Sequence, residues 1–315
     1  MGDWFIIKKE AVKLYDTIII GAGISGLTAA IYAARKRMNY RIISSDFGGQ
    51  FMVSGEVLNY PGIVKTTGAA FSSVMEKQMK FNNVKVSMET VKGIKRQGSN
   101  FKVITDKNKY GTRTAIIATG SKPRKLNVPG EEEFARKGVT YCSICDGPLF
   151  AGKDVAVIGG GDAALEAVDF LKDIVSKIYL VVLEDKFKAH EYLQERVKKN
   201  PKVEALFNAK GSEILGNKFV SGIRYEQDGE EKKLNVLGII IEIGRMPNTE
   251  SFNKIVKLDE HKHIVIDCQG HTNVPGIFAA GDCASGHEYQ YVIAAGQGCM
   301  ALIKAARYLA SKKGD

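Results

Sequence analysis

Apolar residues are arranged in the same way at two places in the chain. Residues 16–20 and 155–158 form short apolar runs, which are typical of strands that are buried on both faces of a parallel sheet. Each run is followed by a glycine-rich turn and then by a stretch of helical character, residues 27–35 and 165–172. The pattern therefore predicts a strand–turn–helix unit at the start of each half of an α/β protein.

The two turns share one spacing of small residues. They read Gly21, Gly23 and Gly26 in the first turn, and Gly159, Gly161 and Ala164 in the second. In such a motif the first position permits a tight turn, the second lets the backbone approach a pyrophosphate, and the third allows close helix–strand packing. The first N–H groups of the following helix attract the phosphates. One such turn would be weak evidence, but two in the correct context predict two nucleotide sites on two Rossmann-like domains.

Length and composition agree with two globular domains. The chain has 315 residues, of which 44% are hydrophobic and 25% charged, so two domains are expected in place of one core. The net charge is +10, but Lys and Arg are spread along the chain, which favours a solvated surface over a nucleic-acid site. The first 16 residues are too charged for a signal peptide and no stretch is long enough to cross a bilayer, so we expect a cytoplasmic protein with no membrane partner.

Two of the five cysteines carry the candidate chemistry. Cys142 and Cys145 form a Cys-x-x-Cys motif, whereas Cys268, Cys283 and Cys299 are isolated. A zinc site would need two more ligands at comparable spacing, and the sequence offers none, so no metal is expected. An odd number of cysteines also argues against a structural disulfide scaffold. The pair is therefore interpreted as redox-active.

The glycine turns and the cysteine pair occur together with further family-like segments, so the sequence resembles the low-molecular-weight thioredoxin reductases over nearly its whole length. The segments that fit, in the family's order, are residues 48–50, 56–62, 118–120, 142–147, 244–249, 276–282 and 294–300. The resemblance implies an α/β fold of two Rossmann-like three-layer dinucleotide-binding domains, the second inserted into the first. It places an FAD domain at residues 1–124 and 251–315 and a pyridine-nucleotide-type domain with the cysteine pair at residues 125–250. It also implies a homodimer.

The resemblance further implies which residues bind FAD. They are Gly21, Gly23, Ser25 and Gly26 at the pyrophosphate, Gly49, Gln50 and Asn59 by the flavin, Ala118, Thr119 and Gly120 where the chain leaves the domain, and Gly281, Asp282 and Gln290. Asp282 would accept hydrogen bonds from cofactor hydroxyls, and an aspartate there could at the same time cap a helix. Gln290 would begin the last helix, whose positive end would stabilise the reduced flavin. Tyr289 replaces the family's usual arginine.

By the same resemblance, the cysteine pair receives electrons from FAD and reduces a thioredoxin or a glutaredoxin-like protein. Cys145 would face the flavin, and Cys142 would be the more accessible thiol that attacks the partner's disulfide. The residues suit the start of a helix, where the thiolate is stabilised. Asp146 would be the general acid or base, with helix capping as the alternative. Cys283 and Cys299 would be packed apolar groups, and Cys268 would lie in a polar turn.

The sequence departs from the family where the 2′-phosphate of NADPH would bind. Val182, Leu183 and Glu184 stand in place of a His-Arg-Arg group, with Lys188 at a fourth cationic position. Each missing charge-assisted contact would cost about 1.5–3 kcal/mol, so poor NADPH use is expected. Glu184 is a candidate for binding the NADH ribose, but it comes two residues later than in NADH-using relatives. The electron donor could therefore be NADH or a compound that is not a nicotinamide. Gly159 and Gly161 would form the glycine turn in either case.

Two other functions remain compatible with these residues. One is the reductase component of a peroxidase system. Because only 15 residues precede the first strand, we expect a stand-alone form without an extra N-terminal thioredoxin-like domain. The other is a flavin-dependent redox sensor, which would not turn over. Ferredoxin-type flavin reductases of the same fold lack the cysteine pair, which argues against that group.

Overall fold

The chain folds into two compact units. The computed structural model describes residues 14–53, 56–57, 59–286 and 288–312. The second unit, Lys122–Met246, is inserted between two segments of the first, which ends at Ser121 and resumes at Pro247. The connecting segments form strands β9 (Ser121–Pro123) and β18 (Arg245–Pro247), which pair with each other. The expected α/β fold is thereby confirmed, and the change of unit comes slightly before the predicted positions, Arg124 and Glu250. The assignment of a nucleotide to each unit stays a prediction.

The first unit is built on one sheet with the strand order β5-β2-β1-β8-β7-β6, and β19 also pairs with β8. The strands are β1 (Leu14–Ile20), β2 (Tyr40–Ser44), β5 (Val86–Met88), β6 (Val91–Gln97), β7 (Asn100–Thr105), β8 (Lys109–Ile117) and β19 (Ile277–Ala279). β1 runs parallel to β2 and β8. The first half of β8 pairs antiparallel with β7, and its last three residues pair parallel with β19. The sheet is therefore completed by a strand from the C-terminal segment.

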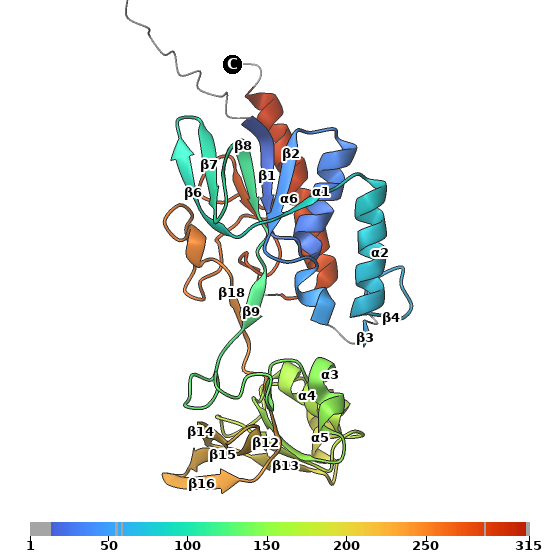
Figure 1. Cartoon of the computed structure of the whole chain (residues 1–315), viewed down its shortest axis with the longest axis vertical. Coiled ribbons are helices and arrows are strands. Elements are labelled where there is room, and N and C mark those ends of the chain that lie inside the picture. The colour runs from blue at the N-terminus through green and yellow to red at the C-terminus, as the bar shows by residue number, and fades with distance from the viewer. Residues whose placement is uncertain (1–13, 54–55, 58, 287, 313–315) are drawn as a thin grey trace, which may run out of the picture. The chain divides into compact units, whose positions relative to one another are not determined.

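Helices cover one face of this sheet (Figure 1). They are α1 (Ile24–Arg35), α2 (Gly68–Phe81) and α6 (Tyr291–Ser311); the unit also contains η1 (Gly49–Val53), η3 (Glu250–Phe252) and the short strands β3 (Glu56–Val57) and β4 (Thr66–Thr67). Successive residues of a strand point to opposite faces, so Ile19 packs in the helical core with Leu27 and Leu302. Ile18 and Ile20 belong to the core on the other face. The central strand is thus buried on both sides, as its apolar run predicts.

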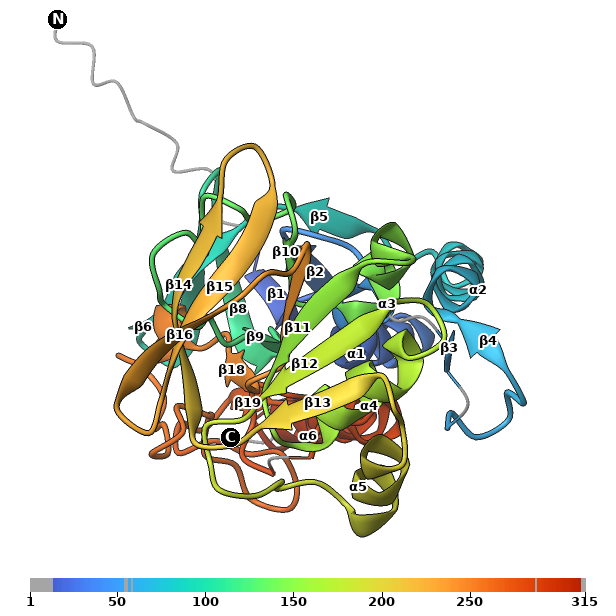
Figure 2. The same ribbon diagram turned by 90° about the horizontal axis from the view of Figure 1, so that it is seen from below.

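The second unit has a five-stranded parallel sheet with the order β10-β17-β11-β12-β13. Its strands are β10 (Val139–Thr140), β11 (Asp154–Ile158), β12 (Lys177–Val181), β13 (Val203–Leu206) and β17 (Gly238–Ile241). One face is covered by helices and the other by an antiparallel sheet (Figure 2). The covering elements are α3 (Ser143–Asp146), η2 (Gly147–Phe150), α4 (Asp162–Leu171) and α5 (Glu191–Lys198), and on the other side β14 (Ala209–Gly216), β15 (Val220–Gln227) and β16 (Glu230–Leu234). This is a three-layer arrangement.

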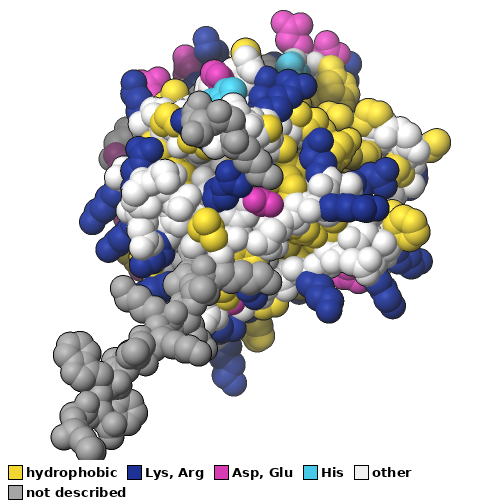
Figure 3. Space-filling model, turned by 90° about the horizontal axis from the view of Figure 1, so that it is seen from above, with side chains coloured by type: hydrophobic (Ala, Val, Ile, Leu, Met, Phe, Trp, Pro, Cys, Tyr) yellow, Lys and Arg dark blue, Asp and Glu magenta, His cyan; other side chains and the backbone are white. Residues whose placement is uncertain are grey.

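The surface carries many basic side chains. In the face shown by Figure 3, Lys and Arg are distributed among apolar and uncharged atoms and do not form one continuous basic stripe. Across the described part of the chain, none of the helices combines the length and the apolar character that a membrane span requires.

Candidate functional site

The first glycine turn joins β1 to α1 and is closed by backbone contacts. Gly21 has a φ of +106°, and a Cβ on it would lie 2.2 Å from the carbonyl oxygen of Ala118. A Cβ on Gly26 would lie 1.9 Å from the carbonyl oxygen of Gly21. No residue with a side chain can take either place without moving the backbone. The two glycines thus fix the start of α1 against the end of β8.

The same turn leaves polar groups that suit a dinucleotide. Gly23 is the N-cap of α1 and supplies no capping side chain, and the first turn of the helix holds no acidic residue. A Cβ on Gly23 would meet nothing within 4 Å. The Oγ of Ser25 is buried and makes no hydrogen bond to any described residue. Free N–H groups, an unpaired hydroxyl and open space at a helix N-terminus fit a pyrophosphate, so the residues present fit FAD.

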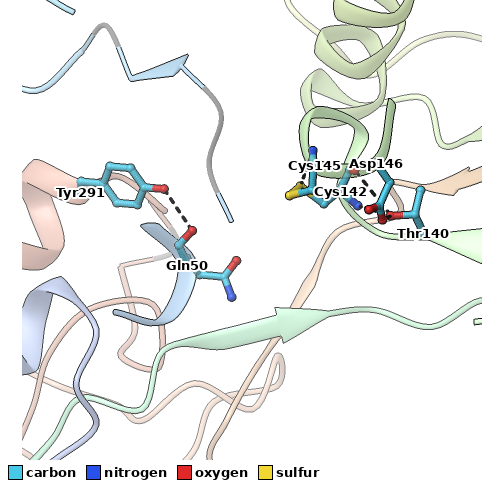
Figure 4. Close-up of a disulfide and its surroundings, with 6 residues drawn as sticks. All are labelled: Gln50, Thr140, Cys142, Cys145, Asp146 and Tyr291. Atoms are coloured by element: carbon cyan, nitrogen blue, oxygen red, sulfur yellow. Dashed lines mark hydrogen bonds between the residues drawn. A yellow bond between two sulfur atoms is a disulfide. The ribbon is translucent and has the colours of Figure 1, made fainter. Parts of the chain in front are cut away.

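Residues expected beside the flavin make hydrogen bonds within the first unit to residues that lie far from them in the sequence. Asn59 Nδ2 donates to Gln290 Oε1 at 3.2 Å. Gln50 Nε2 donates to the carbonyl oxygen of Ser121 at 3.2 Å, and the Tyr291 hydroxyl donates to the carbonyl oxygen of Gln50 at 3.4 Å (Figure 4). Gln50 lies in η1 directly after Gly49. Gln290 is the N-cap of α6, as expected.

Asp282 does not cap a helix. Residues 281–286 form turns, so the capping alternative is wrong. Asp282 Oδ2 instead accepts a hydrogen bond from Ser121 Oγ at 3.0 Å. The backbone N–H of the preceding residue, Gly281, donates to Gln297 Oε1 on α6 at 2.7 Å. The carboxylate is therefore held at the end of β19, next to the segment by which the chain leaves the first unit.

Asn248 holds that segment. Its backbone N–H donates to the carbonyl oxygen of Gly120 at 2.9 Å, and its Nδ2 donates to the carbonyl oxygen of Thr119 at 3.0 Å. The Thr119 hydroxyl returns a bond to the carbonyl oxygen of Asn248 at 2.7 Å. Three hydrogen bonds thus fix the outgoing chain against the returning one.

Cys142 and Cys145 are joined by a disulfide at the start of α3, with their Cα atoms 5.4 Å apart. Cys142 is the N-cap of the helix, and its Sγ accepts a hydrogen bond from the N–H of Cys145 at 3.2 Å. The expected position at a helix start is confirmed. The expected accessibility is not, because Cys145 is exposed and Cys142 is half-buried. The Cys142 sulfur turns back onto the N–H of Cys145 in its own helix.

Asp146 ends α3 and interacts with a residue that the sequence analysis did not single out. Asp146 Oδ2 accepts a hydrogen bond from Thr140 Oγ1 at 2.5 Å (Figure 4). Thr140 Oγ1 also accepts from the N–H of Cys142 at 3.1 Å. Asp146 stands at the N-cap position of the η2 helix that follows, as the capping alternative expects, but its side chain makes no capping bond there. Its catalytic role stays a prediction.

A second carboxylate supports the chain just before the pair. Glu131 is buried and accepts from the N–H groups of Leu126 and Asn127 at 2.8 and 2.6 Å. It also accepts a bond from the Tyr141 hydroxyl at 2.6 Å. Burial, followed by this hydrogen bond, raises the pKa of Tyr141. Tyr141 precedes Cys142 directly, so this network fixes the entry to the redox turn, and no sequence motif pointed to it.

The second glycine turn has an acidic and apolar surrounding. Val182 is buried, and its side chain would be 2.6 Å from a Cβ placed on Gly160. Glu184 forms an ion pair with Lys188, whose hydrogen bond lowers the pKa of the glutamate. Gly161 is the N-cap of α4, and Asp162 adds an acid to the first turn of that helix. Lys188, the one cation expected at the phosphate position, is thus paired with Glu184, which stands where the family has an arginine.

The remaining cysteines differ in exposure. Cys283 is buried, and burial raises its pKa, as expected for a packed thiol. Cys299 is only half-buried, and Cys268 is exposed. In the part of the chain that the structure describes, no three His, Cys, Asp or Glu side chains are grouped so as to hold a metal ion.

Comparison with known families gives one match that covers most of the chain. The family described as pyridine nucleotide-disulphide oxidoreductase matches residues 15–306. Two solved structures are similar over nearly their whole lengths. The thioredoxin reductase of Lactococcus lactis has a TM-score of 0.87 and 34% identity, and the match covers 94% of this chain and 99% of that protein. The thioredoxin reductase of T. acidophilum has a TM-score of 0.84 and 34% identity, with 95% and 99% covered.

Curated relatives match the chain with only part of their length. A component of the alkyl hydroperoxide reductase of Staphylococcus aureus is 40% identical over 305 residues, which are 95% of this chain and 60% of that protein. The NADH dehydrogenase of Bacillus subtilis is 37% identical over 298 residues, which are 94% of this chain and 58% of that protein. The chain therefore spans about three fifths of the length of these relatives.

Proposed function

Because the chain belongs to the pyridine nucleotide-disulphide oxidoreductase family, we propose that it is a flavin-dependent disulfide reductase whose substrate is a thioredoxin-like protein. The observation that carries the proposal is the disulfide between Cys142 and Cys145. It lies at the start of a helix, beside a carboxylate, in a chain whose first unit fits a dinucleotide. The similarity to thioredoxin reductases of L. lactis and T. acidophilum supports a thioredoxin-like partner.

The first unit would hold FAD through its glycine turn. The N–H groups at the start of α1 and the unpaired hydroxyl of Ser25 suit the pyrophosphate. Gln50, Asn59 and Gln290 would line the flavin, and Asp282 would accept from cofactor hydroxyls. When bound, FAD supplies a carrier of two electrons that can reduce a disulfide.

The residues of the second unit would exchange those electrons with the partner. Two-electron reduction breaks the Cys142–Cys145 bond and, with uptake of one proton, leaves one thiol and one thiolate. The thiolate attacks the partner's disulfide to form a mixed disulfide. The other cysteine then resolves it, which releases the reduced partner and restores the Cys142–Cys145 bond. Asp146 would take up and return the thiol proton, and Thr140 would hold the carboxylate in place.

The test is steady-state reduction of oxidised thioredoxin by the purified yellow protein with an electron donor in excess. Cys142→Ser and Cys145→Ser should each abolish turnover while leaving flavin content unchanged. Cys268→Ser changes an exposed cysteine outside the pair and should retain full activity. A colourless protein that does not take up FAD, or turnover that survives loss of either paired sulfur, would refute the proposal.

The order of the two sulfurs can be determined in the same variants. The family resemblance assigns the attack on the partner to Cys142, whereas Cys145 is the more exposed residue here. If Cys142 attacks, the Cys145→Ser protein should trap the partner as a stable mixed disulfide and the Cys142→Ser protein should not. The opposite pattern would assign the attack to Cys145.

We propose NADH as the donor. The acids near the second glycine turn disfavour an additional phosphate, because Glu184 occupies an expected cationic position and pairs with Lys188. The B. subtilis relative is named an NADH dehydrogenase, which agrees with this choice. Stopped-flow mixing of the oxidised protein with each nucleotide should show flavin bleaching at much lower concentrations of NADH than of NADPH. Equal bleaching would contradict the assignment, and none with either would point to a donor that is not a nicotinamide.

A second function is favoured by one observation. Several relatives at 40% identity are named as components of an alkyl hydroperoxide reductase, so the partner could belong to a peroxidase system. Peroxide-dependent oxidation of NADH in the presence of a disulfide-forming peroxidase, without added thioredoxin, would favour this alternative. Dependence on thioredoxin would favour the thioredoxin reductase function.

The homodimer implied by the resemblance is tested by light scattering of the flavin-loaded protein.

A further inference from the structure

Two consecutive residues lead into the redox turn, and their side chains lie on opposite faces of the parallel sheet. Thr140 is the last residue of β10, and Tyr141 follows it directly before Cys142. The Thr140 hydroxyl binds Asp146 on the side of α3 (Figure 4). The Tyr141 ring packs instead against the core cluster on the side of the antiparallel layer, to which Val139 belongs. The chain that carries Cys142 is thus held from both faces of the sheet.

The contact on the Tyr141 side ends in a buried carboxylate. The Tyr141 hydroxyl donates to Glu131 Oε1 at 2.6 Å, and Glu131 is 1% exposed. The backbone N–H groups of Leu126 and Asn127 donate to the same carboxylate at 2.8 and 2.6 Å. All three partners are donors, and an ionised carboxylate accepts hydrogen bonds without donating any. The hydrogen-bonding chemistry of this position therefore matches a glutamate.

Glu131 lies on a loop that is itself fixed. The preceding residue, Gly130, has a φ of +85°, and a Cβ on it would lie 2.2 Å from the carbonyl oxygen of Ile214 on β14. The backbone N–H of Ile214 donates to the carbonyl oxygen of Pro129 at 2.9 Å. The loop is therefore held against the antiparallel layer, so its carboxylate is a rigid acceptor for Tyr141.

These contacts matter most when the disulfide is open. In the oxidised protein the Cys142–Cys145 bond closes the turn covalently. In the reduced protein that bond is broken, and noncovalent contacts keep the two sulfurs near each other. Order that is already present in the dithiol lowers the entropic cost of forming the ring, because fewer conformations are lost on closure. A turn that is held in place therefore favours the disulfide and speeds its formation.

We propose that Glu131 is a positioning residue, which acts through Tyr141 to hold the reduced Cys142–Cys145 pair ready for ring closure. The inference deepens the proposed function and rests on it, because it concerns the last step of the same exchange. In that step the thiolate of one cysteine attacks the sulfur of the other, which is bonded to the partner. The Cys142–Cys145 bond forms and the bond to the partner breaks. The partner leaves with that electron pair as a thiolate, which takes up a proton from water, so no further oxidant or reductant is needed.

The first measurement is the redox equilibrium of the pair. The flavin-loaded protein is equilibrated without oxygen in mixtures of reduced and oxidised dithiothreitol, and the state of the pair is read by alkylation and mass spectrometry. Tyr141→Phe removes the bond to Glu131 and keeps the ring that packs in the core. Because its reduced turn is less ordered, the ratio of dithiol to disulfide should rise about threefold to tenfold, the size expected for one lost hydrogen bond.

Glu131→Gln tests the acceptor. An amide offers one acceptor oxygen and brings a donor into a site that already has three donors, so this variant should shift the equilibrium in the same direction. If Glu131 acts through Tyr141, the double variant should shift the equilibrium no further than Glu131→Gln alone. Additive shifts would show that the two residues act independently and would overturn the inference.

Ring closure is measured directly with dithiobis(nitrobenzoate), an aromatic disulfide that releases a coloured thiolate. The two-electron-reduced protein carries Cys268→Ser, so that this exposed thiol does not react. The first coloured thiolate is released when the pair attacks the probe, and the second when the ring closes. Tyr141→Phe should slow the second release about threefold to tenfold and change the first by less than about twofold.

Two controls separate this effect from a general loss of stability. Tyr225→Phe removes a hydroxyl from a buried tyrosine of the same core cluster, and Glu132→Gln neutralises the exposed neighbour of Glu131. Both should keep the wild-type equilibrium and the wild-type rate of closure. A Tyr141→Phe protein with an unchanged equilibrium and an unchanged closure rate would overturn the inference. A wild-type pair that dithiothreitol reduces in none of the mixtures would instead refute the proposed function.

Discussion

The Thr140 hydroxyl lies 2.5 Å from Asp146 Oδ2 and also accepts the N–H of Cys142. One threonine thus fixes both the carboxylate and the sulfur-bearing residue that the chemistry needs. Thr140 ends β10 and Asp146 ends α3, so their side-chain bond joins the two ends of the redox turn. We expect this bond to hold the carboxylate where a thiol proton can reach it.

Replacing Asp146 by Asn should therefore slow the reoxidation of the reduced pair by oxidised thioredoxin by about 10²–10⁴-fold, the range typical of a lost general acid or base. Thr140→Val leaves Asp146 unchanged but removes the hydrogen bond that orients its carboxylate. It should slow the same step by about tenfold. Rapid-mixing single-turnover kinetics measure both. Asp228→Asn, an identical change in an exposed hairpin turn of the same unit, should have no effect. An Asp146→Asn protein as fast as wild type would show that another group moves the proton.

The packing of α6 on α1 gives a prediction for the first unit. A Cβ on Gly298 would lie 2.0 Å from the carbonyl oxygen of Ser25, whereas a Cβ on Gly296 would meet nothing within 4 Å. Gly298→Ala should destabilise the fold by about 1–3 kcal/mol through forced separation of the helices. It should also reduce FAD content, since Ser25 lies in the turn expected to bind the cofactor.

Gly296→Ala is the matched control on the same helix. It should stabilise the protein by about 0.5–1 kcal/mol, because alanine favours helix more than glycine does. Thermal unfolding followed by circular dichroism, together with released flavin, measures both variants. Equal stability of the two would contradict the close approach of the helices.

Apolar side chains around the cysteine pair predict how the partner is bound. Ile144 stands between the two cysteines in the sequence and is exposed, and Leu149 is 68% exposed three residues after Asp146. Exposed apolar groups beside a reactive centre suit a protein partner. Leu149→Ala should raise KM for thioredoxin by about tenfold with little change in kcat, as expected for a lost apolar anchor. Phe219, also 68% exposed, directly precedes β15 in the antiparallel layer of the same unit, and Phe219→Ala should leave KM unchanged.

Burial raises the pKa of Glu242, which directly follows β17, and this predicts how stability depends on pH. Its value of about 7 exceeds the ordinary value of 4.5, so the folded state binds the proton more tightly than the unfolded state. That contribution is complete below pH 4.5 and is lost as the pH rises through 7. Glu242→Gln does not titrate, so its stability relative to wild type should increase between pH 5 and pH 8, by on the order of 1 kcal/mol after solvent screening. Denaturant unfolding at both pH values measures this, and a constant difference would contradict the shift.

The sequence was sufficient for features that depend on local pattern. The apolar run at residues 16–20 predicted a doubly buried strand. The glycine turn predicted a helix over residues 27–35, and the helix observed begins three residues earlier, at Ile24. Both follow from steric limits on the chain, which act over a few residues. The family resemblance supplied the insertion of one domain into the other, which no local pattern shows.

Features that depend on contacts between distant segments could not be predicted in this way. The bond from Thr140 to Asp146 needs β10 and α3 in register, and the bond from Asn59 to Gln290 joins residues 231 positions apart.

The pairing of β19 with the end of β8 has a consequence for biosynthesis. Residues 115–117 pair with β1 on one side, but their other side stays unpaired until residues 277–279 have been synthesised, and α6 must follow before α1 is covered. The inserted unit, by contrast, has been synthesised completely by Met246 and can fold first, as domains generally do during synthesis. The unit that starts earliest in translation is therefore the last to be finished, and until then its apolar strands require protection from aggregation.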